Sequence, residues 1–338
     1  MPTVFPEPSA PRTAALGWNE PHVHWFTEST RPEAATSRDM VNRWYRDFPD
    51  SGGRLFRRLR SQRDTEHFQA VDELYVHHLL RQDHDDVRHE EGGGGPDFRV
   101  YDHEALVGVI EVVSLFQQDD WEADDRRHAR LADQLNHRVR PRAGYWVDFD
   151  IEHAERDPPP GPFANVIRLE LAKLPPHEEG TTAHIFYNPP GIQIAVTFIP
   201  MAAGSSLKSD PSANIVAAGG GVGGLVTAAQ RLKDRVSSKA GGRYEIADAP
   251  FAIAVGVHDW SCTNDQVREA LYGPTGEGAS LFGVDKERPE GRHTRLSAVV
   301  VVADLRLWEP DAADVAVYDN PHATRRLPDS LLTGAPRP

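Results

Sequence analysis

Apolar residues recur at helical spacing in residues 65–82, TEHFQAVDELYVHHLLRQ. Phe68, Val71, Leu74, Tyr75 and Leu79 fall close to the i, i+3, i+4 positions of one helix face. This is the clearest amphipathic pattern in the chain, and Glu73 lies beside its apolar face. Weaker or more highly charged patterns predict further helices at residues 37–63, 119–139, 162–174, 222–238 and 264–271.

Short apolar runs between these helices predict strands. A hairpin is expected from residues 97–102 and 106–116, and a second one around the turn NPPG at 188–191. Other strands are expected at 144–151, 250–257 and 296–304. Because strands and helices alternate along the chain, the predicted class is α/β or α+β.

The pattern also predicts the domain organisation. Residues 1–36 are rich in Pro, Ser and Thr, and we expect them to form a flexible N-terminal arm. No convincing linker interrupts residues 37–328, which predicts a single domain there, followed by a tail at 329–338.

Composition narrows the class of protein. The chain has 338 residues, 39% of them hydrophobic, and a formal net charge of −14, which argues against a surface coated in basic side chains. A local basic cleft remains compatible with that charge. The lone Cys262 excludes an intrachain disulfide and indicates a reducing cytoplasm. No apolar run approaches the roughly 20 residues that span a membrane, so no membrane partner is expected.

Acidic residues near the first hairpin are the main candidates for chemistry. Asp97 opens one hairpin strand, Glu111 lies in the other, and Glu73 lies in the preceding helix. Acids on neighbouring strands can converge at one edge of a sheet, where carboxylate oxygens suit a hard cation such as Mg²⁺ or Mn²⁺. Such a cation assists phosphoryl chemistry by offsetting negative charge.

The order helix, strand, strand, helix, strand, with Glu73, Pro96-Asp97 and Glu111, resembles the PD-(D/E)xK, or restriction-endonuclease-like, nucleases. The similarity extends to an uncharacterised bacterial family that is regarded as restriction-endonuclease-like, and it runs over most of residues 65–328. The stretches that carry it are FQAVDELYVHHLLR, PDFRVYDHEALVGVIEV, LKDRVSSKAGGRYEIADAPFAIAVGV, REALYG, LSAVVVV and YDNPHATRRLP.

The resemblance implies a mixed sheet flanked by helices, with a C-terminal α/β elaboration. It implies a nuclease that uses Mg²⁺ (or Mn²⁺), held by Glu73, Asp97 and Glu111, to hydrolyse phosphodiester bonds. DNA is the expected partner ahead of RNA, genome defence is the implied setting, and a homodimer is left open.

The chain departs from the family pattern at one position. Two residues after Glu111, where the pattern has a lysine, stands Val113. Some nucleases of this superfamily carry the lysine on a nearby helix, which makes Lys233 and Lys239 the candidates to replace it. They lie six residues apart in one predicted helix and point about 240° from each other, so at most one should face the site. The candidates for phosphate contact are Arg54, Arg57, Arg58 and Arg60.

Two other functions stay open. The missing lysine and the acidic charge favour a degenerate nuclease fold that binds nucleic acid or protein without catalysis. Gly219, Gly221 and Gly224 match the G-x-G-x-x-G fingerprint of FAD- or NAD-binding oxidoreductases, although the acid expected about 20 residues later is absent. A lysine ammonium within about 4–6 Å of the Asp97 and Glu111 carboxylates would favour catalysis.

Overall fold

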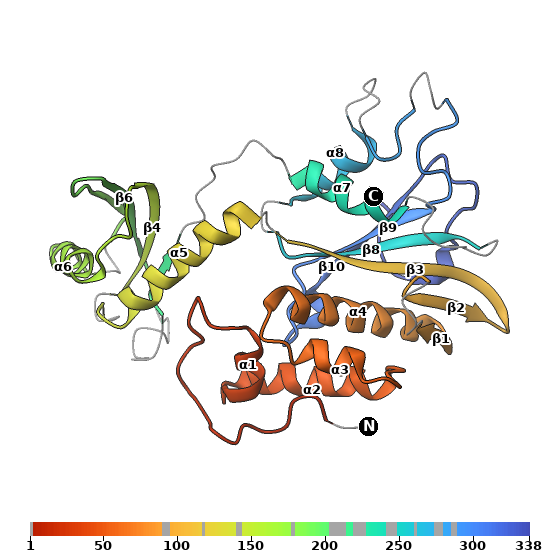
Figure 1. Ribbon diagram of the computed structural model, residues 1–338, viewed down its shortest axis with the longest axis horizontal. Coiled ribbons are helices and arrows are strands. Elements are labelled where there is room, and N and C mark those ends of the chain that lie inside the picture. Colours follow the sequence, from red (N-terminus) through yellow and green to blue (C-terminus); the bar gives the residue numbers. More distant parts are fainter. Residues whose placement is uncertain are drawn as a thin grey trace. The chain divides into compact units, whose positions relative to one another are not determined.

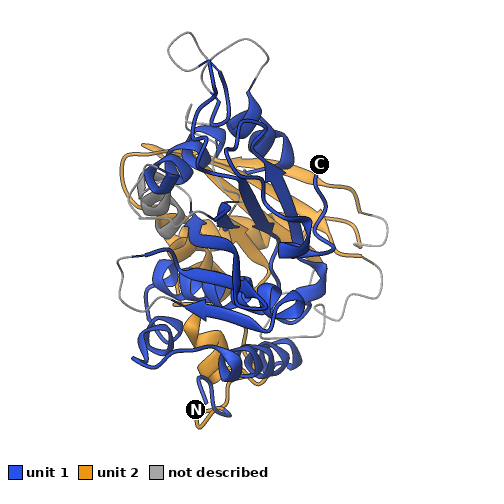
Figure 2. Ribbon diagram, turned by 90° about the vertical axis from the view of Figure 1, so that its right-hand side faces the viewer, with its two compact units in different colours: residues 1–7, 31–117, 224–338 blue, residues 8–30, 118–223 orange. Residues whose placement is uncertain are grey.

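The computed structural model describes most of the chain, and its described part divides into two compact units (Figure 2). The first comprises residues 1–7, 31–117 and 224–338, and the second comprises residues 8–30 and 118–223. This differs from the single domain expected over residues 37–328. The described residues are 3–89, 95–116, 119–139 (side chains from 127), 144–176, 180–202, 214–218, 228–240, 249–259, 262–273, 280–284 and 289–338.

The first unit is built on a six-stranded mixed sheet, with the order β1-β2-β3-β8-β9-β10 (Figure 1). The first three strands are antiparallel, β3, β8 and β9 are parallel, and β10 is antiparallel to β9. The predicted α+β class is therefore confirmed. The strand bounds are β1 Asp86–His89, β2 Phe98–Asp102, β3 Ala105–Leu115, β8 Phe251–Val257, β9 Ala298–Ala303 and β10 Asp314–Asp319.

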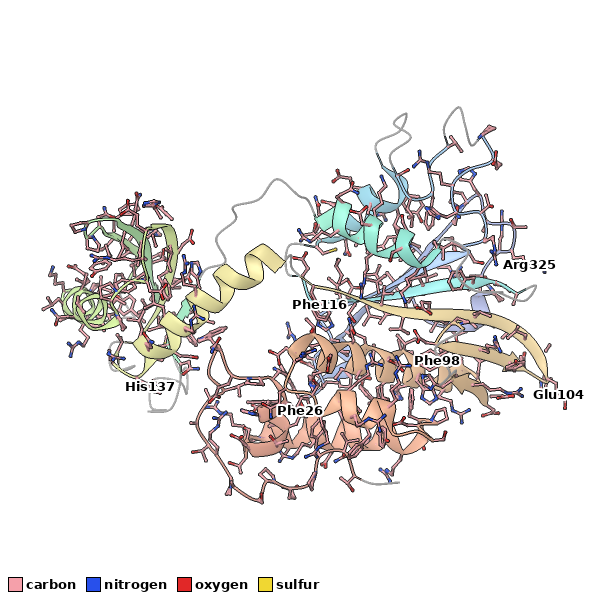
Figure 3. The ribbon with its side chains drawn as sticks, in the orientation of Figure 1. Phe26, Phe98, Glu104, Phe116, His137 and Arg325 are labelled. Atoms are coloured by element: carbon pink, nitrogen blue, oxygen red, sulfur yellow. The ribbon has the colours of Figure 1, made fainter. Side chains whose placement is uncertain are left out.

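Helices cover both faces of this sheet (Figure 1). One face carries α2 (Pro32–Asp47), α3 (Arg54–Leu59) and α4 (Asp64–Asp83), and the other carries α7 (Ala228–Ala240) and α8 (Asn264–Tyr272). Phe98 of β2 lies between the sheet and the first group of helices, where its ring packs against Phe48 and His77 (Figure 3).

Alternation along β3 decides which side chain faces which helix layer. Val109 and Val113 belong to the core that includes Leu232 and Val236 of α7. Ser114 points to the opposite face and donates a hydrogen bond to Asp72 of α4. Glu111 shares the parity of Val109 and Val113, so the pleat directs it towards α7.

The second unit has its own four-stranded sheet, with the order β5-β6-β4-β7, and its own core. Phe149, Phe163, Ile194 and Phe198 are fully buried in that core. Among the described residues, no helix is long and apolar enough to cross a membrane. The helices and strands of the second unit are α1 Val23–Glu28, α5 Asp119–Asn136, β4 Tyr145–Ala154, α6 Pro160–Leu171, β5 Ala183–Tyr187, β6 Ile192–Pro200 and β7 Val216–Ala218.

Both ends of the chain differ from the arm and tail expected at residues 1–36 and 329–338. Phe5 is buried, and the Asn42 side chain accepts a hydrogen bond of 3.0 Å from its N–H and donates one of 2.8 Å to its carbonyl. Near the C-terminus Leu331 is buried, and the carbonyl of Pro336 accepts a hydrogen bond of 2.8 Å from the N–H of Val317 in β10. Phe5 and Pro336 therefore make main-chain hydrogen bonds within the first unit, whereas residues 8–30 belong to the second unit.

Candidate active site

The β2–β3 pairing brings Asp97 and Glu111 together. Phe98 pairs with Ile110 in antiparallel register, so Asp97, one residue earlier, stands opposite Glu111, one residue later. Asp97 is fixed there because its Oδ2 accepts a hydrogen bond of 2.7 Å from the N–H of Val112. The sequence prediction that these two acids meet on neighbouring strands agrees with this geometry.

Helix α4 contributes the third predicted acid, Glu73, which is buried. Its Oε1 lies 2.9 Å from Nε2 of His89, at the end of β1, and its Oε2 accepts a hydrogen bond from the Arg58 guanidinium. Burial alone would raise the pKa of Glu73, but the hydrogen bonds and charges of His89 and Arg58 outweigh it and hold that pKa below its usual value. Glu73 is therefore ionised at neutral pH.

His89 has a defined role in this cluster. An ionised carboxylate can only accept a hydrogen bond, so Nε2 of His89 carries the proton that Glu73 accepts. Nδ1 of the same ring is buried and has no hydrogen-bond partner among the described residues. In a neutral imidazole this nitrogen holds a lone pair, and a nitrogen of this kind can bind a metal ion.

Glu73, His89 and Asp97 fit a cation. Each offers a ligand atom, and the three atoms lie within 4.8 Å of one another. The two carboxylates suit Mg²⁺ or Mn²⁺, and the imidazole favours a transition metal such as Mn²⁺ over Mg²⁺. The structure groups His89 with Glu73 and Asp97 in this set, whereas the sequence prediction placed Glu111 there.

Lys239 meets Glu111 from the last turn of α7. Its Nζ lies 2.5 Å from Oε1 of Glu111, and the side chains are 25% and 4% exposed. Lys233, six residues earlier on the same helix, makes no ion pair with the acids of this site in the described part of the chain. Of the two predicted lysines, the structure therefore brings Lys239 to Glu111, and for this carboxylate the distance lies within the 4–6 Å limit that would favour catalysis.

Val113, two residues after Glu111, is a core residue and leaves no place for a polar side chain. Val113 faces α7 and is buried in the core that includes Leu232 and Val236. Two residues apart on β3, Glu111 and Val113 point to the same face. Packing therefore occupies the position of Val113, and the ammonium beside Glu111 comes from Lys239 of α7, which packs on the same face.

The cluster changes the acidity of Asp97. Burial raises the pKa of this carboxyl to about 7, and the negative charges of Glu111 and Glu73 act in the same direction. Asp97 therefore exchanges its proton near neutral pH, which is a property of groups that take part in proton transfer or cation binding.

The four predicted phosphate-binding arginines separate into two kinds. Arg58 points inwards and is paired with Glu73. Arg54, Arg57 and Arg60 are exposed. Arg57 and Arg60 also donate hydrogen bonds to the carbonyls of Gly52 at 3.1 Å and Val4 at 2.6 Å. Three of the four therefore remain candidates for contact with a phosphate backbone.

His89 was not predicted as a site residue because the histidines near the acids show no metal-binding spacing such as H-E-x-x-H. The segment around it is also turn-rich in sequence. Residues Asp86–His89 form β1, which pairs with β2 so that His89 stands opposite Phe98, next to Asp97. The signal that could have found it is the tetrapeptide DVRH followed by a glycine run, which is compatible with a hairpin returning to β2.

The glycine fingerprint of Gly219, Gly221 and Gly224 lies outside the described residues. No family model, no curated protein and no solved structure matches this chain. Inferences about function therefore depend on the geometry of the cluster formed by Glu73, His89, Asp97, Glu111 and Lys239.

Proposed function

We propose that this protein is a metal-dependent nuclease that hydrolyses phosphodiester bonds, in DNA ahead of RNA. The observation that carries the proposal is the Lys239 ammonium 2.5 Å from Glu111, beside the cluster of Glu73, His89 and Asp97. A cation site next to a lysine suits phosphodiester hydrolysis, because both positive charges can stabilise the negative charge that develops on the phosphate as it is attacked.

The order of elements supports the same function. Within the first unit, helix α4, strands β1, β2 and β3, helix α7 and strand β8 follow one another. With β1 as an additional strand, this series contains the order helix, strand, strand, helix, strand that the resemblance to restriction-endonuclease-like proteins implies. Each carries, or pairs with, the part expected of it: Glu73 on α4, Asp97 before β2, Glu111 on β3 and Lys239 on α7. The second unit enters the chain between β3 and α7 without separating these parts in space.

Glu73, Asp97 and His89 would hold Mg²⁺ or Mn²⁺. When bound, the cation supplies Lewis-acid stabilisation of the charge on the scissile phosphate. Asp97 must lose its proton to serve as a ligand, which its pKa of about 7 allows in neutral solution.

Lys239 and Glu111 provide the remaining polar groups. The Lys239 ammonium neutralises Glu111 and is partly exposed, so it can approach a phosphate oxygen or orient the attacking water. The exposed Arg54, Arg57 and Arg60 would hold the flanking phosphates. A cytoplasmic location and a role in genome defence belong to the same proposal.

The test is cleavage of supercoiled plasmid, single-stranded DNA and single-stranded RNA in Mg²⁺, in Mn²⁺ and in chelator. We compare the wild-type protein with the double variant Asp97→Asn, Glu111→Gln, whose replaced groups keep their size. Cation-dependent cleavage by the wild type that disappears in the double variant is expected. Absence of cleavage by folded wild type on all three substrates, or equal cleavage by the double variant, contradicts the proposal.

A second candidate is a binding module that has lost catalysis. Arg58 on Glu73 and Lys239 on Glu111 already neutralise two of the three acids without a cation, which favours it. Such a module would bind labelled nucleic acid, as measured by fluorescence anisotropy, without cleaving it. Its affinity for nucleic acid would not change on addition of Mn²⁺.

A further inference from the structure

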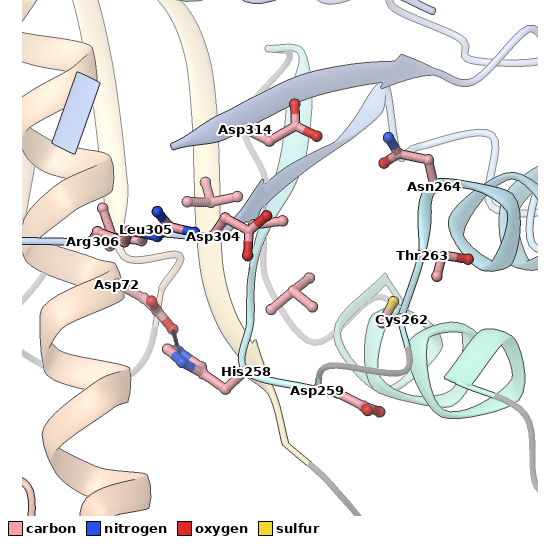
Figure 4. Close-up of a pocket in the computed structure, with 13 residues that line it drawn as sticks. Asp72, His258, Asp259, Cys262, Thr263, Asn264, Asp304, Leu305, Arg306 and Asp314 are labelled. Atoms are coloured by element: carbon pink, nitrogen blue, oxygen red, sulfur yellow. Dashed lines mark hydrogen bonds and ion pairs between the residues drawn. The ribbon is translucent and has the colours of Figure 1, made fainter. Parts of the chain in front are cut away.

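A pocket of ≈ 480 Å³ lies at the carboxyl ends of the parallel strands β8 and β9 (Figure 4). Asp72 of α4, His258 after β8, Asp304 and Arg306 after β9, and Asp314 of β10 contribute to its wall. It shares no residue with the cluster of Glu73, His89, Asp97, Glu111 and Lys239. Its volume falls in the range of small-molecule sites, about 300–1,000 Å³.

Asp72 is one of two buried aspartates that line this pocket, together with Asp259. It is 2% exposed, and Figure 4 shows its carboxylate directed towards His258. Its Oδ2 accepts hydrogen bonds from the Ser114 hydroxyl and from Nε2 of His258, the latter at 2.8 Å. Its Oδ1 is buried and accepts no hydrogen bond from the described residues. A buried carboxylate oxygen is strongly stabilised by a donor, so this one favours a ligand that brings N–H groups.

The imidazole that holds Asp72 is itself fixed. The His258 ring stacks on Phe116 with centroids 5.0 Å apart, and lies 4.8 Å from the Phe68 ring. Gly256 lies directly beneath the Asp72 carboxylate, where a Cβ would be 2.1 Å from Oδ2. Asp72 therefore keeps one position in the pocket, and it is preorganised for a ligand.

The charge of the pocket selects a cation. Asp259 also lines it but is neutralised by a buried ion pair with Arg231. Asp304 and Asp314 make no ion pair within the described chain, and Arg306 is the one lysine or arginine among the lining residues that the structure describes. Three carboxylates against one guanidinium leave the pocket negative, which attracts positively charged ligands.

The spacing of these carboxylates separates an organic cation from a metal ion. In the described residues, the acids of this pocket do not form a group whose ligand atoms all lie within 4.8 Å, as those of Glu73, His89 and Asp97 do. A single ion could not contact all of them. We propose that the pocket binds a small organic cation with two or more charged nitrogens, of the diamine or polyamine class, with Asp72, Asp304 and Asp314 as the accepting groups.

The test uses the full chain and isothermal titration with putrescine and spermidine at constant ionic strength. Saturable binding to the wild type is expected, with affinity at least about tenfold weaker in the double variant Asp304→Asn, Asp314→Asn, because each loses a charge-assisted hydrogen bond. Both substitutions lie at the pocket wall outside the core, so the fold should persist, and circular dichroism checks it. The matched control is Asp102→Asn, an exposed aspartate at the end of β2, which should bind like the wild type.

Three results would overturn the inference. The first is no binding of either amine up to about 10 mM. The second is equal affinity in the wild type and the double variant, which would place the amines elsewhere on this acidic chain. The third is displacement of spermidine by stoichiometric Mn²⁺ in a variant that lacks Asp97, which would make the pocket a metal site. None of these results depends on nuclease activity.

Discussion

Lys239 contacts Glu111, which lies 128 residues earlier in the chain. This contact is the main support for the proposal that the β2–β3 hairpin, with Asp97 and Glu111, belongs to a catalytic site. The resemblance to restriction-endonuclease-like nucleases gave Lys233 and Lys239 as the candidate lysines, and their spacing of six residues on one helix indicated that at most one of them faces the site. The choice between them depends on the rotation of α7 about its axis. That rotation is set by the burial of Leu232 and Val236 against β3 and β8, which only the packed structure reveals.

Asp97 leads to a prediction about pH. Its pKa is raised to about 7 by burial and by Glu111 and Glu73, against about 4 in an unfolded chain. Without a cation, the native state binds a proton that the unfolded state has lost between these values, so the free energy of unfolding falls as pH rises through this window. Cation affinity should change in the opposite sense, since a proton on Asp97 competes with the ion.

Isothermal titration of Mn²⁺ measures this effect. As the pH is raised towards 7, the affinity for Mn²⁺ should increase by up to about tenfold per pH unit, and above pH 7 it should level off. Binding of Mn²⁺ should release protons at pH 6 and almost none at pH 8. Asp97→Asn should remove the proton release, and Asp102→Asn should retain it. Proton release of equal size at pH 6 and pH 8 would show that Asp97 is not the group that titrates.

At the scale of elements, the long periodic segments were predictable and the short ones were not. The amphipathic pattern at 65–82 corresponds to α4, and the hairpin at 97–102 and 106–116 corresponds to β2 and β3. The helix predicted at 37–63 is in fact two, since Phe48 ends α2 in an extended conformation and Gly53, with a positive φ of 62°, precedes α3. β1 was hidden because four mixed residues carry too little periodicity.

The start of α3 depends on Asp50, and this gives a stability prediction. The Asp50 carboxylate accepts hydrogen bonds from the N–H groups of Leu55 at 3.2 Å and Phe56 at 2.8 Å, and from the Tyr45 hydroxyl at 2.8 Å. Asp50→Ala would leave these buried donors without partners, so the free energy of unfolding of the first unit should fall by about 2 kcal/mol.

Urea denaturation followed by circular dichroism measures this loss. Asp47→Ala, three residues earlier on α2 and exposed, is the matched control and should change the free energy of unfolding by less than about 0.5 kcal/mol. Because α3 also carries Arg58, the partner of Glu73, the same variant should alter cation binding. Equal free energies of unfolding for the two variants would mean that the stability of α3 does not depend on the hydrogen bonds to Asp50.

At the scale of the whole molecule, the chain contains an insertion that sequence reasoning missed. Residues 118–223 interrupt the first unit between β3 and α7 and form a second unit with residues 8–30. Because the second unit is itself a mixture of helices and strands, its apolar pattern does not differ from that of the first, and no linker composition marks the boundary. The separation is visible only in two cores that share no residue.

Separate cores predict separate unfolding. Phe198 is buried in the core of the second unit and Phe251 in that of the first. Scanning calorimetry should show two unfolding transitions. Phe198→Ala should lower the midpoint temperature of the second unit's transition alone and reduce that unit's free energy of unfolding by about 3–5 kcal/mol, while Phe251→Ala should do the same for the first unit. A single transition that both variants shift equally would mean that the units unfold cooperatively.

The most direct test of the central claim is the rate of single-turnover DNA cleavage in Mn²⁺ by Lys239→Met and Lys233→Met. Both variants remove an ammonium from α7 and keep a long side chain of similar helix propensity. If Lys239 serves the site formed by Glu73, His89, Asp97 and Glu111, its loss should slow cleavage by about 10²–10⁴-fold, while Lys233→Met stays within about twofold of the wild type. Cleavage by Lys239→Met at the wild-type rate, or an equal loss in both variants, would contradict the account.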